Sequence, residues 1–176
     1  MNKKAQIKFT SLYNISQHGA RNGVCSLVEV DNRRILLDCG CSTDSNTQDL
    51  DGLVERILNL GGADIILISH ADIKHMGALP YVMKRLPNAI LLCTLPVYKM
   101  GCMVLYDWYV NSSMSRYDGL ETFSLEDVDI AFESAVVVKY CQISILAEIS
   151  GTIRHNQSLG SLSACAYPAG RTIGKR

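Results

Sequence analysis

The sequence has little charge and no excess of either sign. Only 19% of its 176 residues are charged, and 17 Lys and Arg side chains balance 17 Asp and Glu. Without net charge, the chain has no overall positive field to attract phosphate backbones or anionic lipid. Apolar residues make up 48%, which excludes the composition of a disordered chain. The length fits about one ordinary domain.

Export signals, membrane spans and repeats are also missing. The first eight residues are polar and basic and lack the apolar stretch of a secretion signal. The most apolar stretch, residues 91–110, contains Pro96, Lys99 and Asp107, which are too costly for a membrane span. No repeat or low-complexity tract interrupts the chain. We therefore expect one soluble domain over residues 1–176 that is not exported and has no membrane partner.

The seven cysteines are an odd number, and most lie in apolar stretches. This pattern favours buried thiols in a reducing compartment over disulfides. Cys39 and Cys41 are the one closely spaced pair, and such a pair can also contribute to a metal site. A single intervening residue and the lack of a second pair favour buried thiols.

Hydrophobic periodicity predicts an α/β protein. Alternating or continuous apolar runs indicate strands, and one-sided apolar stripes indicate helices between them. The strands are predicted at 7–12, 25–30, 33–38, 64–69, 89–94, 136–143 and 161–167, and the helices at 48–60, 76–86, 97–110 and 124–132. Strands that alternate with helices are typical of parallel sheets with crossover connections.

The predicted helix 97–110 has apolar residues at helical spacing. Met100, Met103, Val104 and Trp108 are expected to pack in the core. Any Tyr or Met of this helix that stays exposed is a candidate for a protein interface.

Residues 68–80 carry the clearest chemistry. His70, Asp72 and His75 lie within six residues, at the end of a predicted buried strand. Open α/β sheets place their functional sites at such strand ends. These residue types can ligate a metal ion, but taken alone they favour a solvated loop whose histidines cap the next helix.

Residues 69–80 also resemble the second motif of the metallo-β-lactamase family, in the branch that cuts nucleic acids. Active members carry His-x-His-x-Asp-His there, and these ligands help hold two zinc ions that activate a water. Asp38, at the end of a predicted strand, resembles the first motif, and Pro168-Ala169-Gly170-Arg171 resembles the third. The resemblance implies a metallo-β-lactamase-like αββα sandwich.

Three positions depart from the pattern of active members. Asp72 stands in place of a histidine, Lys74 in place of the aspartate, and Arg171 in place of the third-motif histidine. A cation about 4 Å from a divalent ion is repelled by roughly 8 kcal/mol at an effective dielectric constant of about 20. We therefore predict a chain without catalytic activity, bound metal or other cofactor.

The degenerate site is predicted to hold an internal ion network. Because buried charges need partners, we expect Asp38 and Asp72 to pair with Lys74 and Arg171. The positions that the resemblance assigns to this degenerate active site are Asp38, His70, Asp72, Lys74, His75 and Arg171.

Residues 94–107 and 123–132 resemble a narrower family, subunit 2 of the cleavage and polyadenylation specificity factor. This resemblance implies a nuclear, non-catalytic scaffold for pre-mRNA 3′-end cleavage and polyadenylation. Its implied partners are the active endonuclease subunit and the other subunits of the same factor, with pre-mRNA met through the complex. Because the family continues with further strands and an inserted β-CASP domain, we expect an incomplete sandwich, truncated before that domain.

Two alternatives stay open. In one, His70, Asp72 and His75 keep a metal and the chain is a zinc-dependent RNA endonuclease or metallohydrolase of the same fold. In the other, the chain is a nonfunctional remnant of a longer gene.

Overall fold

The computed structural model describes residues 6–13, 23–43, 45, 47–111 and 123–139. All of them belong to the compact unit Met1–Tyr140. The elements in chain order are β1 (Ile7–Ser11), β2 (Ser26–Val30), β3 (Arg33–Leu37), α1 (Thr47–Asn59), β4 (Ile65–Ile68), α2 (Ile73–Met76), α3 (Leu79–Arg85), β5 (Ile90–Thr94), α4 (Leu95–Asn111), α5 (Leu125–Glu133) and β6 (Val136–Val138).

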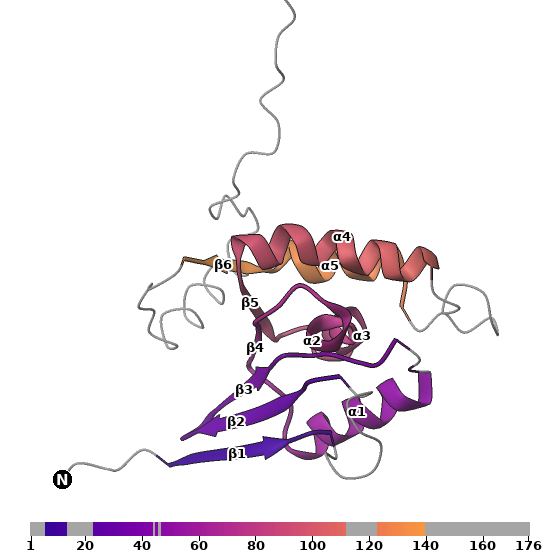
Figure 1. The fold of residues 1–176 in the computed structure, drawn as a ribbon. Helices are drawn as coiled ribbons and strands as arrows, with labels where there is room; N and C mark the ends of the chain where they lie inside the picture. The colour runs from indigo at the N-terminus through magenta and orange to yellow at the C-terminus, as the bar shows by residue number, and fades with distance from the viewer. Residues whose placement is uncertain (1–5, 14–22, 44, 46, 112–122, 140–176) are drawn as a thin grey trace, which may run out of the picture. The chain divides into compact units, whose positions relative to one another are not determined.

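The six strands form one sheet in sequence order, from β1 to β6 (Figure 1). The first three strands are antiparallel neighbours, and β3 to β6 are parallel. Asp31 takes a positive φ of 51° in the tight turn between β2 and β3. The predicted α/β class is therefore confirmed, and the described residues contribute a single sheet of the expected sandwich. The predicted strand at 161–167 lies outside them.

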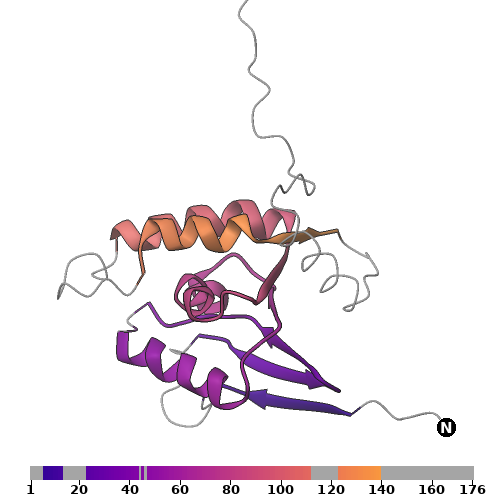
Figure 2. The same cartoon turned by 180° about the vertical axis from the view of Figure 1, so that it is seen from behind.

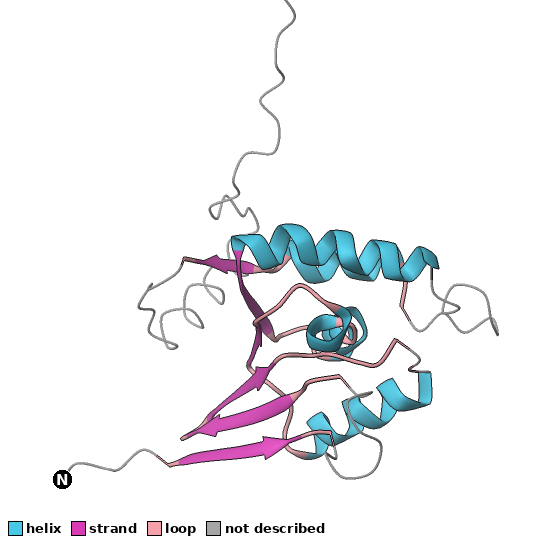
Figure 3. Cartoon of the chain, viewed as in Figure 1, coloured by secondary structure: helices cyan, strands magenta, loops and turns pink. Residues whose placement is uncertain are grey.

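The helices lie along one side of the sheet, as the two opposite views show (Figures 1 and 2). The strand residues on this side are fully buried: Leu27, Leu36, Ile66 and Leu91 are neighbours across four consecutive strands. On the other face of the sheet, Phe9 is 64% exposed and Leu67 is 40% exposed. The core thus lies between the sheet and its single layer of helices (Figure 3).

Helix α1 follows the predicted stripe. Leu50, Leu53, Val54 and Ile57 are buried on one face. The helix ends where Gly61 and Gly62 take positive φ angles of 93° and 83°. The Gly62 N–H donates to the Ile57 carbonyl at 2.9 Å, which satisfies a carbonyl of the last turn.

The predicted helix at 76–86 forms as α3, which begins three residues later and ends one residue earlier, and the short helix α2 precedes it. Helix α2 ends at Met76, and α3 begins at Leu79 with Pro80 in its first turn. Proline lacks an N–H and favours the first turn of a helix, so the chain restarts there. Helix α5 begins as predicted, with Ser124 as its N-cap and a reciprocal hydrogen bond from Asp127.

Helix α4 is longer than predicted and packs differently. Trp108 is buried as expected, but Met100 and Met103 are 58% and 72% exposed, so their predicted place in the core is wrong. Its buried residues are Val97, Gly101, Leu105 and Trp108. No helix within the described ranges is long and apolar enough to cross a membrane.

Candidate functional site

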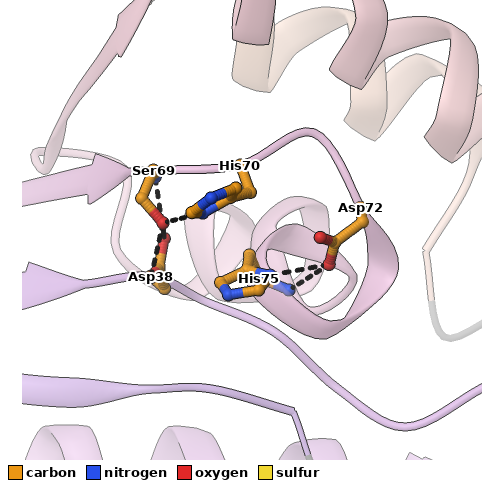
Figure 4. A network of polar contacts seen from close by, with 5 residues as sticks. All are labelled: Asp38, Ser69, His70, Asp72 and His75. Carbon is orange, nitrogen blue, oxygen red and sulfur yellow. Dashed lines mark hydrogen bonds and ion pairs between the residues drawn. The ribbon is translucent and has the colours of Figure 1, made fainter.

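The candidate site lies at the carboxyl ends of two neighbouring parallel strands. Strand β3 ends at Leu37 and presents Asp38, and β4 ends at Ile68 and presents Ser69 and His70 (Figure 4). The Asp38 N–H donates to the Leu67 carbonyl at 2.8 Å and keeps the two strand ends together. Sites in α/β sheets commonly form at this edge, and here the two predicted motifs meet there.

Ser69 links Asp38 to His70. Its N–H and its hydroxyl donate to Asp38 Oδ1 at 2.8 Å each, and its hydroxyl lies 2.8 Å from Oδ2 as well. Ser69 Oγ is also 2.8 Å from His70 Nδ1. Because the single hydroxyl proton is directed to the carboxylate, His70 Nδ1 must carry the proton and donate to Oγ. In the neutral ring, this assignment leaves His70 Nε2 as an acceptor.

Asp72 forms a second unit with His75. Asp72 is the N-cap of α2, and its Oδ1 accepts from the His75 N–H at 3.1 Å and from His75 Nδ1 at 2.7 Å. Partial burial raises the pKa of Asp72, but hydrogen bonds from the His75 ring and backbone outweigh it and lower the pKa below its ordinary value. The rings of His70 and His75 lie 4.6 Å apart between centroids.

Backbone hydrogen bonds fix the segment after β3 against α2. The N–H groups of Cys39 and Cys41 donate to the carbonyls of His75 and Ile73 at 2.7 and 3.1 Å. Gly40 lies between them, and a Cβ there would be 1.5 Å from the Lys74 carbonyl oxygen. Only glycine permits this approach of two backbones.

Cys39 and Cys41 are fully buried beside this site, as the buried-thiol interpretation predicted. Burial raises the pKa of Cys41 to about 12 and raises that of Cys39 well above its ordinary value. Without a metal ion, both side chains are therefore protonated thiols near neutral pH. The five cysteines in the described part of the chain are all free thiols.

The Lys74 part of the predicted ion network does not form among the described residues. Asp38 is bound by Ser69, and Asp72 is bound by His75. Lys74 is exposed, and it makes no ion pair with any described residue. An exposed ammonium is hydrated and needs no carboxylate partner, which removes the reason for the predicted pair. Arg171 lies outside the described residues.

The structure therefore brings together Asp38, His70, Asp72 and His75, and it leaves Lys74 in solvent. Sequence reasoning missed Ser69, although a hydroxyl next to His70 at a strand end was a usable signal. Within the described ranges, no three His, Cys, Asp or Glu side chains converge in an arrangement that could hold a metal ion.

Comparison with known proteins places the chain in a superfamily. Residues 27–175 match the model of the metallo-beta-lactamase superfamily domain. The chain belongs to this superfamily.

Within it, the chain is similar to cleavage and polyadenylation specificity factor subunit 2, which confirms the narrower resemblance. It is 38% identical to that subunit from Oryza sativa subsp. japonica over 124 residues, 70% of this chain and 16% of that protein. It is also 38% identical to the probable subunit 2 of Drosophila melanogaster over 133 residues, 74% of this chain and 17% of that protein. For the Arabidopsis thaliana subunit, identity is 34% over 122 residues, 69% of this chain and 16% of that protein. The chain thus spans about a sixth of the length of these relatives.

Proposed function

We propose that this chain is a non-catalytic scaffold component in pre-mRNA 3′-end cleavage and polyadenylation. In this role it pairs with an active endonuclease subunit in the nucleus and meets pre-mRNA through the assembled complex. The support is its similarity to cleavage and polyadenylation specificity factor subunit 2 from plants and insects.

The bond between Asp72 and His75 is the observation that carries the non-catalytic part. In active members the position of Asp72 supplies an imidazole ligand, whereas here its carboxylate binds the ring and the backbone of His75. This bond occupies His75 Nδ1 and Asp72 Oδ1, so each of these atoms already has a partner. A carboxylate engaged in this way is a poorer metal ligand, because it would first have to break charge-assisted hydrogen bonds.

Lys74 and Asp38 support the same conclusion. Lys74 replaces a carboxylate ligand with a positive charge, and both Asp38 oxygens lie within 2.8 Å of the Ser69 hydroxyl. The residues present do not fit the two zinc ions that the family pattern implies.

In place of catalysis, the site has a structural role. Asp38, Ser69 and His70 join the ends of β3 and β4, and Asp72 with His75 fixes the start of α2. Hydrogen bonds to an ionised carboxylate are about twice as strong as neutral ones, so these contacts hold the loops rigidly.

Restoring the family ligands tests the non-catalytic part. The triple variant Asp72→His, Lys74→Asp and Arg171→His should bind more zinc by calorimetric titration than the unaltered chain. Lys8→Asp makes the same lysine-to-aspartate change far from the site and should leave zinc uptake unchanged. If the unaltered chain already binds zinc tightly and hydrolyses RNA, the zinc-dependent endonuclease is the correct function.

Co-purification tests the scaffold part. The chain and the active endonuclease subunit of the same organism, produced together with a tag on one of them, should elute as a stoichiometric complex. Separate elution at micromolar concentrations would contradict pairing and would leave the non-catalytic assignment standing.

A further inference from the structure

Helix α4 is apolar on two opposite sides. Its inner side packs in the core through Val97, Gly101, Leu105 and Trp108. Large apolar residues also lie on its outer side, where Met103 is 72% exposed and Met100 and Val110 are each 58% exposed. A helix with apolar residues on two opposite sides is normally buried on both, and nothing in the described part of the chain covers the outer side of α4.

The exposed residues form one stripe along the helix. Apart from the adjacent pair Lys99 and Met100, they follow one another at intervals of three or four residues from Pro96 onward, which places them on one face. We call this stripe the outer face of α4: Pro96, Lys99, Met100, Met103, Asp107 and Val110. Methionine adapts its shape readily and is common on protein-binding surfaces.

The charges of the outer face are arranged symmetrically about its centre. Lys99 lies four residues before Met103, and Asp107 lies four residues after it. Lys99 Nζ lies 5.3 Å from the centroid of the Tyr98 ring, and Asp107 accepts a hydrogen bond from Asn111 at 2.8 Å. Neither charge belongs to an ion pair among the described residues.

This symmetry fits a second copy of the same helix. If two α4 helices pack antiparallel around a two-fold axis at Met103, Lys99 of each copy comes to the level of Asp107 of the other. The flexible lysine side chain can then cross the contact, and both pairs join opposite charges. A parallel arrangement would instead bring like charges to the same level. Self-complementary surfaces of this kind are typical of two-fold dimers.

We propose that the outer face of α4 binds a second copy of this chain, with the two helices antiparallel and Met103 at the centre. The helix is about 25 Å long. One pair of helices this short offers less area than the roughly 1,200–2,000 Å² of a stable interface, so the dimer is weak and depends on concentration. The inference does not depend on the proposed function, because self-association is measured without RNA or an endonuclease.

Sedimentation of the full chain over a range of concentrations tests the contact. The unaltered chain should show a dimer fraction that rises with concentration, and Met103→Glu should weaken the dimer about tenfold or more. Leu58→Glu is the matched control, because Leu58 is an exposed leucine on α1, and it should leave dimerisation unchanged. Circular dichroism must show the same helix content in all three proteins.

Exchanging the charges tests the antiparallel geometry. Lys99→Asp alone and Asp107→Lys alone should each weaken self-association about tenfold, because each replaces two attractive contacts with two repulsive ones. Mixing the two variants should restore a dimer, since every cross-contact then joins opposite charges. The proposal is overturned if the unaltered chain stays monomeric, as it would with the face covered by another protein or by another segment of this chain. It is also overturned if Met103→Glu leaves the dimer intact, or if the mixture of charge variants stays monomeric.

Discussion

Helices α1 and α4 both pack on the same side of the sheet, but their opposite faces differ. The outer face of α1 is largely polar, with Gln48, Asp49, Glu55 and Arg56 exposed. The outer face of α4 instead exposes the apolar side chains of Met100, Met103 and Val110. Helix α1 buries most of its apolar side chains against the core, whereas α4 has a second apolar face that does not contact the core. The polar outer face of α1 is suited to solvent, whereas the apolar outer face of α4 is suited to contact with a partner.

The largest effects are expected on the inner faces, where the two helices should behave alike. Leu53→Ala in α1 and Leu105→Ala in α4 remove fully buried side chains, so each should lower the free energy of unfolding by about 2–5 kcal/mol. Urea unfolding measures both. A cost below about 1 kcal/mol for Leu105→Ala would show that α4 does not pack in the core as described.

The glycines of the two helices should respond with opposite signs. A Cβ on Gly52 in α1 meets no atom within 4 Å, so Gly52→Ala should stabilise the chain by about 1 kcal/mol through helix propensity. A Cβ on Gly101 in α4 would lie 2.5 Å from Met76 Cε. Crowding in a packed core costs about 1–3 kcal/mol, so Gly101→Ala should destabilise on balance. Thermal unfolding of both variants measures the signs, and stabilisation by Gly101→Ala would refute the close packing of α4.

Helix α5, which packs against α4, should lose stability in a pH-dependent way when the Asp127 carboxylate that accepts hydrogen bonds from its Ser124 cap is removed. Partial burial raises the pKa of Asp127, but bonds from Ser124 and Lys84 outweigh it and lower the pKa below its ordinary value. A depressed carboxyl pKa stabilises the fold above the unfolded-state pKa, and the contribution is lost as pH falls through the folded-state pKa. Asp127→Asn should therefore cost about 1 kcal/mol at pH 7 and progressively less below about pH 4. Urea unfolding at a series of pH values checks this, and a pH-independent difference would contradict the assigned role of the carboxylate.

The smallest effects are expected on the outer faces of the monomer. Met103→Ser and Leu58→Ser change exposed side chains, so each should alter the unfolding free energy by less than about 0.5 kcal/mol under dilute conditions. Unfolding at the lowest detectable protein concentration measures the monomer alone. A loss above about 1 kcal/mol for Met103→Ser would mean that Met103 packs within its own chain.

The sequence correctly predicted burial where the apolar residues of an element lie on one side only. The one-sided stripe of α1 and the apolar strand before His70 each indicate which residues are buried, and both are confirmed. Helix α4 has apolar residues on two opposite sides, so its sequence pattern does not show which methionines are exposed. The short helix α2 at 73–76 was not predicted, because periodicity does not resolve a helix of so few residues.

The sequence predicted which residues of the candidate site lie together, but not the bonds among them. The two motifs gave Asp38, His70, Asp72 and His75, and these residues do lie together. Pairing with Lys74 failed as a prediction because it assumed that the lysine is buried, and burial of a side chain in a four-residue helix is set by tertiary packing. Ser69 was missed because its role depends on Asp38 from the neighbouring strand, 31 residues away.

The zinc content of the unaltered chain tests the central claim most directly. The protein should be purified without chelators, equilibrated with excess zinc and freed of unbound metal, and then its zinc should be measured by elemental analysis. Because Asp72 is held by His75 and Lys74 replaces a carboxylate ligand, we predict well under one zinc ion per chain. Two zinc ions retained per chain would contradict the account and restore the hydrolase.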